Sequence, residues 1–121
     1  MVAVSLKNVL QKSDFITLHV PKFSDKAIIG ADEIGLMKDG AGIINTARGG
    51  IIDEDALMFA LDKGKLAYAA LDVFKNEPSP SIHLMMHNNI SLSPHIGAAT
   101  LEAQDRIGTE LAKKNISYFN K

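Results

Sequence analysis

The sequence contains no cysteine, which excludes disulfide bonds and metal sites built on thiolate ligands. A chain without disulfides fits a reducing compartment, so we expect a cytoplasmic protein. It also has no run of basic residues and a formal net charge of −1, which argues against nucleic acid or an anionic membrane as a partner. No apolar stretch approaches the roughly 20 residues of a membrane span. The N-terminus shows no pattern of a signal peptide.

What is present is ordinary for a soluble globular chain. Apolar residues make up 46% and charged residues 22% of the 121 residues. This length corresponds to one domain or a piece of one. There is no internal repeat and no low-complexity tract.

The most informative stretch is residues 43–57, which is typical of a strand, a tight turn and the start of a helix. The pair Gly49 and Gly50 lets the backbone turn sharply and come close to a ligand. Asp53 is a favourable N-cap for the helix. Arg48 lies between the strand and the helix, where ligands bind in open α/β sheets, and its guanidinium fits a carboxylate. Alternatively, Arg48 pairs only with a nearby acid.

The rest of the chain alternates between strand and helix patterns. We expect strands at 15–20, 41–46, 67–73 and 90–93, and helices at 5–12, 31–37, 53–63 and 100–120. The strand at 15–20 is nearly all apolar, as in a strand buried on both faces. Residues 22–30 form a polar loop, and 81–89 a connection of uncertain shape. The alternation predicts an α/β fold with a mainly parallel sheet of about four strands.

Three ionisable residues each follow the carboxyl end of a predicted strand, namely Arg48, Glu77 and His95. Because parallel strands end at one edge of a sheet, three loops could converge there on one substrate. Arginine can hold a carboxylate, and histidine can give or take a proton near neutral pH. A carboxylate bonded to the other ring nitrogen would orient the histidine. The trio suits redox at a carbinol carbon beside a carboxylate.

Each residue also has a structural interpretation. Glu77 precedes a proline and could be a solvated loop acid, while His95 could cap the last helix or bond a backbone carbonyl. Three further histidines are read as structural, one inside a buried strand and two in a polar connection: His19, His83 and His87. They do not form a metal site, because no carboxylate or second histidine has ligand spacing.

These residues lie in segments that resemble the D-isomer-specific 2-hydroxyacid dehydrogenases. The segments keep their order over almost the whole chain: Ser-Asp-Phe-Ile-Thr-Leu-His-Val-Pro at 13–21, Asn-Thr-Ala-Arg-Gly-Gly-Ile-Ile-Asp at 45–53, Ala-Leu-Asp-Val-Phe at 70–74 with Glu-Pro at 77–78, and Ser-Pro-His-Ile-Gly-Ala at 93–98. Residues 70–74 and 101–104 look most like the D-3-phosphoglycerate dehydrogenase branch.

The resemblance implies roles for individual residues. In that family the residue matching Arg48 binds the substrate carboxylate, the one matching His95 is the acid–base, and the one matching Glu77 is its partner. Asp72, at the end of a strand, could accept a hydrogen bond from the nicotinamide amide. The resemblance implies NAD contacts at positions matching Val20, Thr46, Ala47, Arg48, Asp72, His95, Gly97 and Ala98.

The family's glycine-rich phosphate-binding turn, with its flanking strands and helix, has no counterpart here. Gly40 and Gly42 precede a strand instead of following one. We therefore expect residues 1–121 to be the second half of a Rossmann-type NAD-binding domain, without its first half or the substrate domain. The expected function is an NAD-dependent D-2-hydroxyacid dehydrogenase fragment, inactive alone. The alternatives are a non-enzymatic self-associating half-domain or a relative of NAD-sensing corepressors.

The strand at 15–20 would be central in the intact family fold and would become an edge here. An exposed edge with free N–H and C=O groups is a template for pairing with another chain. Apolar surface on the helices at 5–12 and 100–120 would favour association as well. We therefore expect a homodimer with this strand or these helices at the interface.

Overall fold

Four short strands form one parallel sheet in the computed structural model, which describes residues 2–120. The strands are β1 (Phe15–Leu18), β2 (Ala41–Asn45), β3 (Leu66–Leu71) and β4 (Ile90–Leu92), and they lie in the order β1-β2-β3-β4. The helices are α1 (Leu6–Lys12), α2 (Ala31–Leu36), α3 (Glu54–Asp62), α4 (Ile82–Met86) and α5 (Leu101–Phe119). The predicted α/β fold with a four-stranded parallel sheet is confirmed.

Side-chain caps set the starts of four helices, among them α3, where the sequence predicted Asp53 as the cap. The Ser5 hydroxyl accepts a bond from the Asn8 amide, and Asp53 Oδ1 accepts bonds from the first turn of α3. Thr100 Oγ1 caps α5 in the same way. Ser81 caps α4, a short helix inside the connection whose shape the sequence left open.

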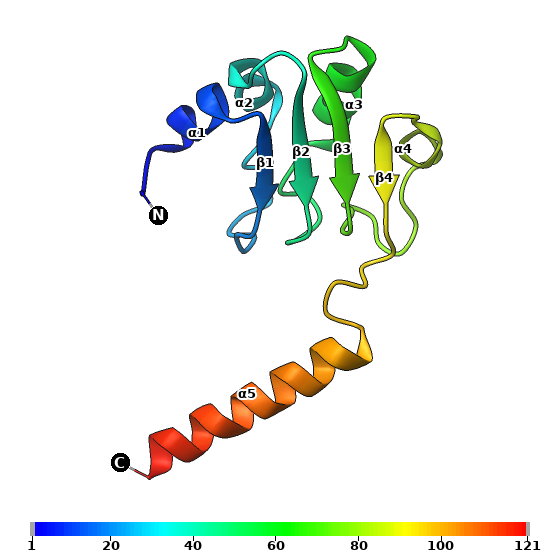
Figure 1. Cartoon of the computed structure of the whole chain (residues 1–121). Helices are drawn as coiled ribbons and strands as arrows, with labels where there is room; N and C mark the ends of the chain where they lie inside the picture. The colour runs from blue at the N-terminus through cyan, green and yellow to red at the C-terminus, as the bar shows by residue number, and fades with distance from the viewer. Residues whose placement is uncertain (1, 121) are drawn as a thin grey trace.

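The core lies between the sheet and the helices α2 and α3, which share one face (Figure 1). Ile16, Ile43 and Ala69 are register neighbours on β1, β2 and β3, and all three are buried. Leu57 and Leu61 on the inward side of α3 pack into the same cluster. Burial of this apolar layer is the main source of the domain's stability.

The strand at 15–20 is shorter than predicted, and the expectation that both of its faces are buried is wrong. β1 ends at Leu18 and alternates, with Ile16 and Leu18 buried and Phe15 64% exposed. His19 is therefore outside the strand and exposed, and its ring Nε2 lies 2.9 Å from Thr17 Oγ1. The reason is that, within residues 2–120, helices pack on one face of this sheet and leave the other open.

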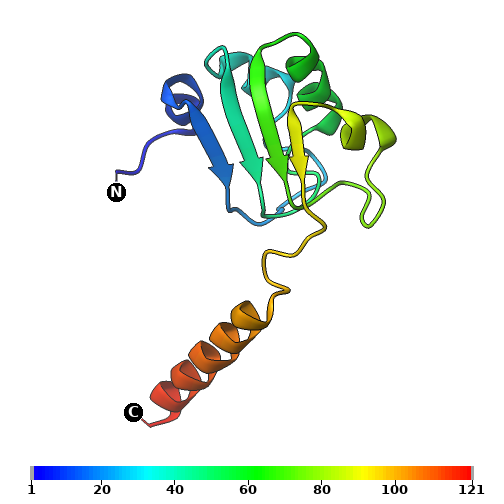
Figure 2. The ribbon, with the colours of Figure 1, turned by 45° about the vertical axis from the view of Figure 1, so that its right-hand side comes forward.

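The last helix stands apart from the rest of the fold. α5 runs away from the carboxyl edge of the sheet in both views (Figure 1, Figure 2), and none of its residues is buried. Over residues 2–120 the structure contains no helix that is both long and apolar enough to cross a membrane.

Candidate functional site

His95 and Glu77 form a close pair beyond the carboxyl ends of β4 and β3. His95 Nδ1 lies 2.7 Å from Glu77 Oε2, while Glu77 Oε1 accepts the Phe74 amide at 3.0 Å. The hydrogen bond from His95, followed by that from Phe74, lowers the pKa of Glu77. An ionised carboxylate only accepts hydrogen bonds, so Nδ1 carries the proton and Nε2 is left to exchange protons with a ligand.

The buried carboxylate of Asp72 holds the loop that carries His95. Oδ1 accepts the Ser93 hydroxyl at 2.6 Å and the Ile96 amide at 3.0 Å, and Oδ2 accepts the Gly97 amide at 3.0 Å. Burial acts to raise the pKa of Asp72, but these three bonds and the charge of His95 outweigh it and lower the pKa. The anchors flank His95, whose backbone is left-handed with φ 55°.

Arg48 follows β2 in a turn shaped by a buried asparagine. Asn45 is only 2% exposed, and its amide accepts from the Ala47 N–H at 3.1 Å and donates to the Arg48 carbonyl at 3.0 Å. The Arg48 guanidinium donates from Nη1 to the Ala47 carbonyl at 2.7 Å. The side chain is thus folded toward its own turn.

Gly49 brings the Arg48 turn against the loop that carries Glu77. A Cβ on Gly49 would lie 1.8 Å from the Phe74 carbonyl oxygen and 3.0 Å from the Lys75 nitrogen. Only a residue without a side chain allows two backbones to meet this closely. The loops after β2 and β3 are therefore in direct backbone contact beside the site.

The three residues predicted to act together all lie in loops at the carboxyl edge of the sheet. The structure joins Glu77 to His95 directly. Within residues 2–120, no hydrogen bond or ion pair links Arg48 to either of them. The arrangement offers a proton-exchanging nitrogen held by a carboxylate, with a guanidinium on the adjoining turn.

The predicted NAD contacts are spread along the same edge. Val20 lies just after β1 and is 40% exposed, and Thr46 and Ala47 belong to the Arg48 turn. Gly97 sits against Asp72, where a Cβ would lie 3.1 Å from Oδ2, and Ala98 follows it. Asp72 is 5% exposed and its carboxylate already accepts three hydrogen bonds. A carboxylate can accept about four, so one acceptor position is left for a ligand amide. The cofactor roles of these residues stay predictions.

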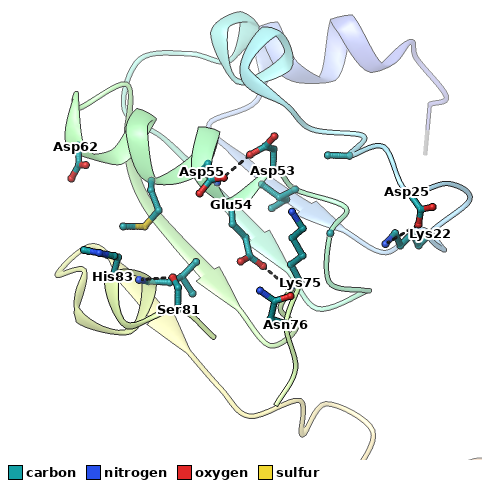
Figure 3. A pocket seen from close by; sticks show the side chains of 15 residues that line it. Lys22, Asp25, Asp53, Glu54, Asp55, Asp62, Lys75, Asn76, Ser81 and His83 are labelled. Carbon is teal, nitrogen blue, oxygen red and sulfur yellow. Dashed lines mark hydrogen bonds and ion pairs between the residues drawn. The ribbon is translucent and has the colours of Figure 1, made fainter. Parts of the chain in front are cut away.

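A cleft of about 540 Å³ lies elsewhere, around the N-terminus of α3 (Figure 3). Glu54 Oε1 accepts the Lys75 amide there at 2.6 Å, which ties α3 to the loop after β3. Arg48, Glu77 and His95 do not line this cleft. The polar residues that line it are labelled in Figure 3: Lys22, Asp25, Asp53, Glu54, Asp55, Asp62, Lys75, Asn76, Ser81 and His83. In residues 2–120 no group of three histidine or acidic side chains is placed to hold a metal ion.

Two residues that shape the site were not foreseen from the sequence. Asn45 appeared there only within the predicted strand and the family segment at 45–53, and Glu54 only within the predicted helix at 53–63. A polar residue that closes an otherwise apolar strand was the available signal for Asn45, because a buried amide needs partners in the following turn. Nothing in the sequence indicated that Glu54 would reach a backbone amide 21 residues away.

Comparison with known proteins gives a consistent result. The family model described as D-isomer specific 2-hydroxyacid dehydrogenase, NAD binding domain, matches residues 1–97. D-3-phosphoglycerate dehydrogenase 2, chloroplastic, from Arabidopsis thaliana is 45% identical over 112 residues, covering 91% of this chain and 18% of that protein. Hydroxypyruvate reductase from Thermotoga maritima is 48% identical over 115 residues, covering 92% of this chain and 38% of that protein.

A solved structure matches the fold as well. D-Lactate dehydrogenase from Aquifex aeolicus, complexed with NAD and lactic acid, has a TM-score of 0.77 and 34% identity, covering 98% of this chain and 41% of that one. The chain thus spans well under half the length of these relatives. The residues matched by the family model end before α5.

Proposed function

This chain belongs to the D-isomer specific 2-hydroxyacid dehydrogenase family, in its NAD-binding domain, and we propose that it carries the substrate-binding and acid–base residues of that chemistry. The observation that carries the proposal is the 2.7 Å contact between His95 and Glu77, beside the turn that bears Arg48. The three side chains come from three different loops at one sheet edge.

Each residue has a distinct role in this proposal. Arg48 leaves the Ala47 carbonyl and takes the substrate carboxylate in a bidentate pair, which orients the carbinol carbon. His95 Nε2 accepts the hydroxyl proton during oxidation and returns it during reduction. Glu77 keeps the proton on Nδ1 and balances the charge that the ring gains.

NAD is the proposed cofactor, and when bound it supplies the acceptor for the hydride. Val20, Thr46, Ala47, Gly97 and Ala98 would contact it together with Arg48 and His95, and Asp72 would accept a hydrogen bond from the nicotinamide amide. We propose a D-2-hydroxy acid as the substrate class and, within it, the phosphoglycerate branch. The 45% identity to a D-3-phosphoglycerate dehydrogenase supports this branch, whereas the 48% identity to a hydroxypyruvate reductase supports a neighbouring one.

We further propose that residues 1–121 correspond to the second half of the NAD-binding domain. No turn in this chain offers the glycine-rich backbone that normally holds the pyrophosphate at a helix N-terminus. Cofactor orientation should then be poor, and a misplacement of about 1 Å costs roughly a hundredfold in rate. The 121-residue chain should show no useful NADH oxidation with 2-oxo acids, with or without a 3-phosphate group. Robust turnover would contradict this assignment.

The site itself is tested by binding instead of turnover. Adding a D-2-hydroxy acid should shift the NMR signals of the Arg48 guanidinium and the His95 ring, and Arg48→Ala should abolish the shift of the His95 ring. Lys75→Ala is the matched control, because Lys75 lines the separate cleft around α3. Shifts confined to that cleft would refute the assignment.

A second candidate function is a non-enzymatic, self-associating half-domain. In the part of the chain that the structure describes, β1 is an edge strand, and α5 has no buried residue. Both features favour a homodimer with the 15–20 strand or the flanking helices at the interface. A role like that of NAD-sensing corepressors is a third alternative. Calorimetry with NADH separates a cofactor-binding role, which requires measurable affinity, from a half-domain that only self-associates.

A further inference from the structure

The loop that carries Glu77 leaves the core of the protein soon after β3. Residues 71–74 are buried, and Phe74 is only 7% exposed. Residues 75–79 are all exposed, so apolar burial does not hold the Glu77 side chain in place. Its carboxylate nevertheless has to face the His95 ring to make the 2.7 Å contact between them. Polar contacts must therefore fix this part of the loop.

Two consecutive backbone amides at the start of the loop are each bound by a carboxylate. The Phe74 N–H donates to Glu77 Oε1 at 3.0 Å, and the Lys75 N–H donates to Glu54 Oε1 at 2.6 Å. The first bond lies within the loop, whereas the second comes from α3 (Figure 3). A bond this short fits a charged acceptor, and such bonds are roughly twice as strong as those between neutral groups. Glu54 thus anchors the exposed part of the loop to a helix.

α3 is a firm support for this anchor. Its first turn is capped by Asp53, and Leu57 and Leu61 on its inner side are 0% and 4% exposed in the core. Glu54 is the first residue of the helix, so its carboxylate extends from a backbone that is already fixed. Groups mounted on helices and strands hold their partners more precisely than groups on loops do.

We propose that Glu54 is a positioning residue for the pair formed by Glu77 and His95. By holding the Lys75 amide, it sets the path of the loop, so that one Glu77 oxygen meets the Phe74 amide and the other meets His95 Nδ1. The importance of this role for catalysis rests on the acid–base function proposed above. The positioning itself is a property of the folded chain and is tested without turnover.

The competing explanation is that Glu54 only stabilises α3, because an acid in the first turn interacts favourably with the helix dipole. Asp55 is the matched comparison, since it is the next residue of that turn and lines the same cleft (Figure 3). In the described part of the chain its carboxylate has no hydrogen bond to the loop, and only its amide is bonded, to Asp53. A change at Asp55 therefore removes the charge without releasing the loop.

Two substitutions of Glu54 separate its reach from its charge. Glu54→Asp keeps the charge and the first-turn acid, but it is one methylene shorter and cannot hold the Lys75 amide in the same place. Glu54→Gln loses the charge and keeps an acceptor oxygen at the same distance. Both variants keep a polar first residue of α3 and leave the core unchanged, so the fold should stay intact, as circular dichroism would show.

Hydrogen exchange of the complete chain is the first measurement. In Glu54→Asp the loop opens more easily, so exchange at the Phe74 amide should be faster by roughly tenfold to a hundredfold, the effect of one bond to a charged group. Glu54→Gln should retain most of the protection, and Asp55→Asn should retain all of it. In the unmodified chain the Lys75 amide should be protected although its residue is exposed.

The pKa of Glu77, followed by carboxyl carbon NMR, is a readout that a merely structural role would not move. The hydrogen bonds from His95 and Phe74 lower this pKa, while desolvation and the charge of Asp72 act to raise it. Glu54→Asp should bring the pKa of Glu77 back toward its ordinary value, because both bonds weaken. Glu54→Gln should not raise it, since loss of a nearby negative charge favours the ionised carboxylate.

Three results would overturn the proposal. They are free exchange of the Lys75 amide in the unmodified chain, unchanged behaviour of Glu54→Asp, and effects of Asp55→Asn or Glu54→Gln as large as those of Glu54→Asp. None of these measurements uses a ligand. A chain that passes them but does not bind a D-2-hydroxy acid would refute the proposed function and leave the positioning role of Glu54 standing.

Discussion

Replacing Gly49 with alanine should destabilise this fold through a single methyl group. The added carbon would lie 1.8 Å from the Phe74 carbonyl oxygen and 2.3 Å from its carbon. Ordinary contact requires about 3.4 Å, so the Arg48 turn and the loop after β3 must separate by about 1.5 Å. Both obstacles are backbone atoms, which cannot rotate out of the way as a side chain would.

The cost follows from what holds those two loops. The turn is fixed by the Asn45 amide and the other loop by the carboxylates of Glu54 and Glu77. Overpacking of a rigid contact costs about 1–3 kcal/mol, and we expect the free energy of unfolding to fall by that amount. The same displacement would move Arg48 away from the pair formed by His95 and Glu77.

Urea unfolding followed by circular dichroism measures the effect. Gly35→Ala on α2 is the matched control, since nothing lies within 4 Å of a Cβ there. It should stabilise the chain by about 0.5–1 kcal/mol, because alanine suits a helix better than glycine does. Equal stabilities of Gly49→Ala and the unmodified chain would refute the close-contact explanation.

Three further predictions concern the polar groups of the site. His95→Ala should bring the pKa of Glu77 back toward its ordinary value, as carboxyl carbon NMR would show, because the bond that chiefly lowers it is lost. Since its folded pKa is lowered, Asp72 contributes stability above its unfolded pKa of about 3.8, and this is lost as the pH falls through the folded value. Asp72→Asn should remove that acid sensitivity in unfolding experiments between pH 5 and about 2. Asn45→Ala leaves the Ala47 amide and the Arg48 carbonyl without their partner and should cost about 1–3 kcal/mol in urea unfolding.

Local signals made the order and type of the elements predictable. The caps at Ser5, Asp53 and Thr100 fix helix starts through bonds that span only two or three residues. The sequence also predicted that the loops bearing Arg48, Glu77 and His95 share one edge of the sheet, because parallel strands place their carboxyl ends together. α4 could have been predicted too, because Ser81 precedes it as a cap.

Long-range features could not be predicted in this way. The apolar sequence of β1 fits burial on both faces, and which faces are covered depends on where α2, α3 and α5 go. Asp72 looked like a ligand for a cofactor amide, whereas its main bonds in the fold go to residues 21 to 25 positions later. The folded-back position of Arg48 rests on a local contact with the Ala47 carbonyl, and the side-chain conformation that makes this contact is not specified by the sequence pattern.

The order of the strands has a consequence for how the chain is made. Because β1, β2, β3 and β4 lie side by side in the order in which they are synthesised, each strand after β1 finds the neighbour that precedes it in the chain already present. Neighbouring residues such as Phe15, Gly42 and Tyr68 are roughly 20 to 30 positions apart, which keeps loop-closure costs moderate for a parallel sheet. Growth on the ribosome could therefore proceed strand by strand, and β4 with the His95 loop would be the last part to close.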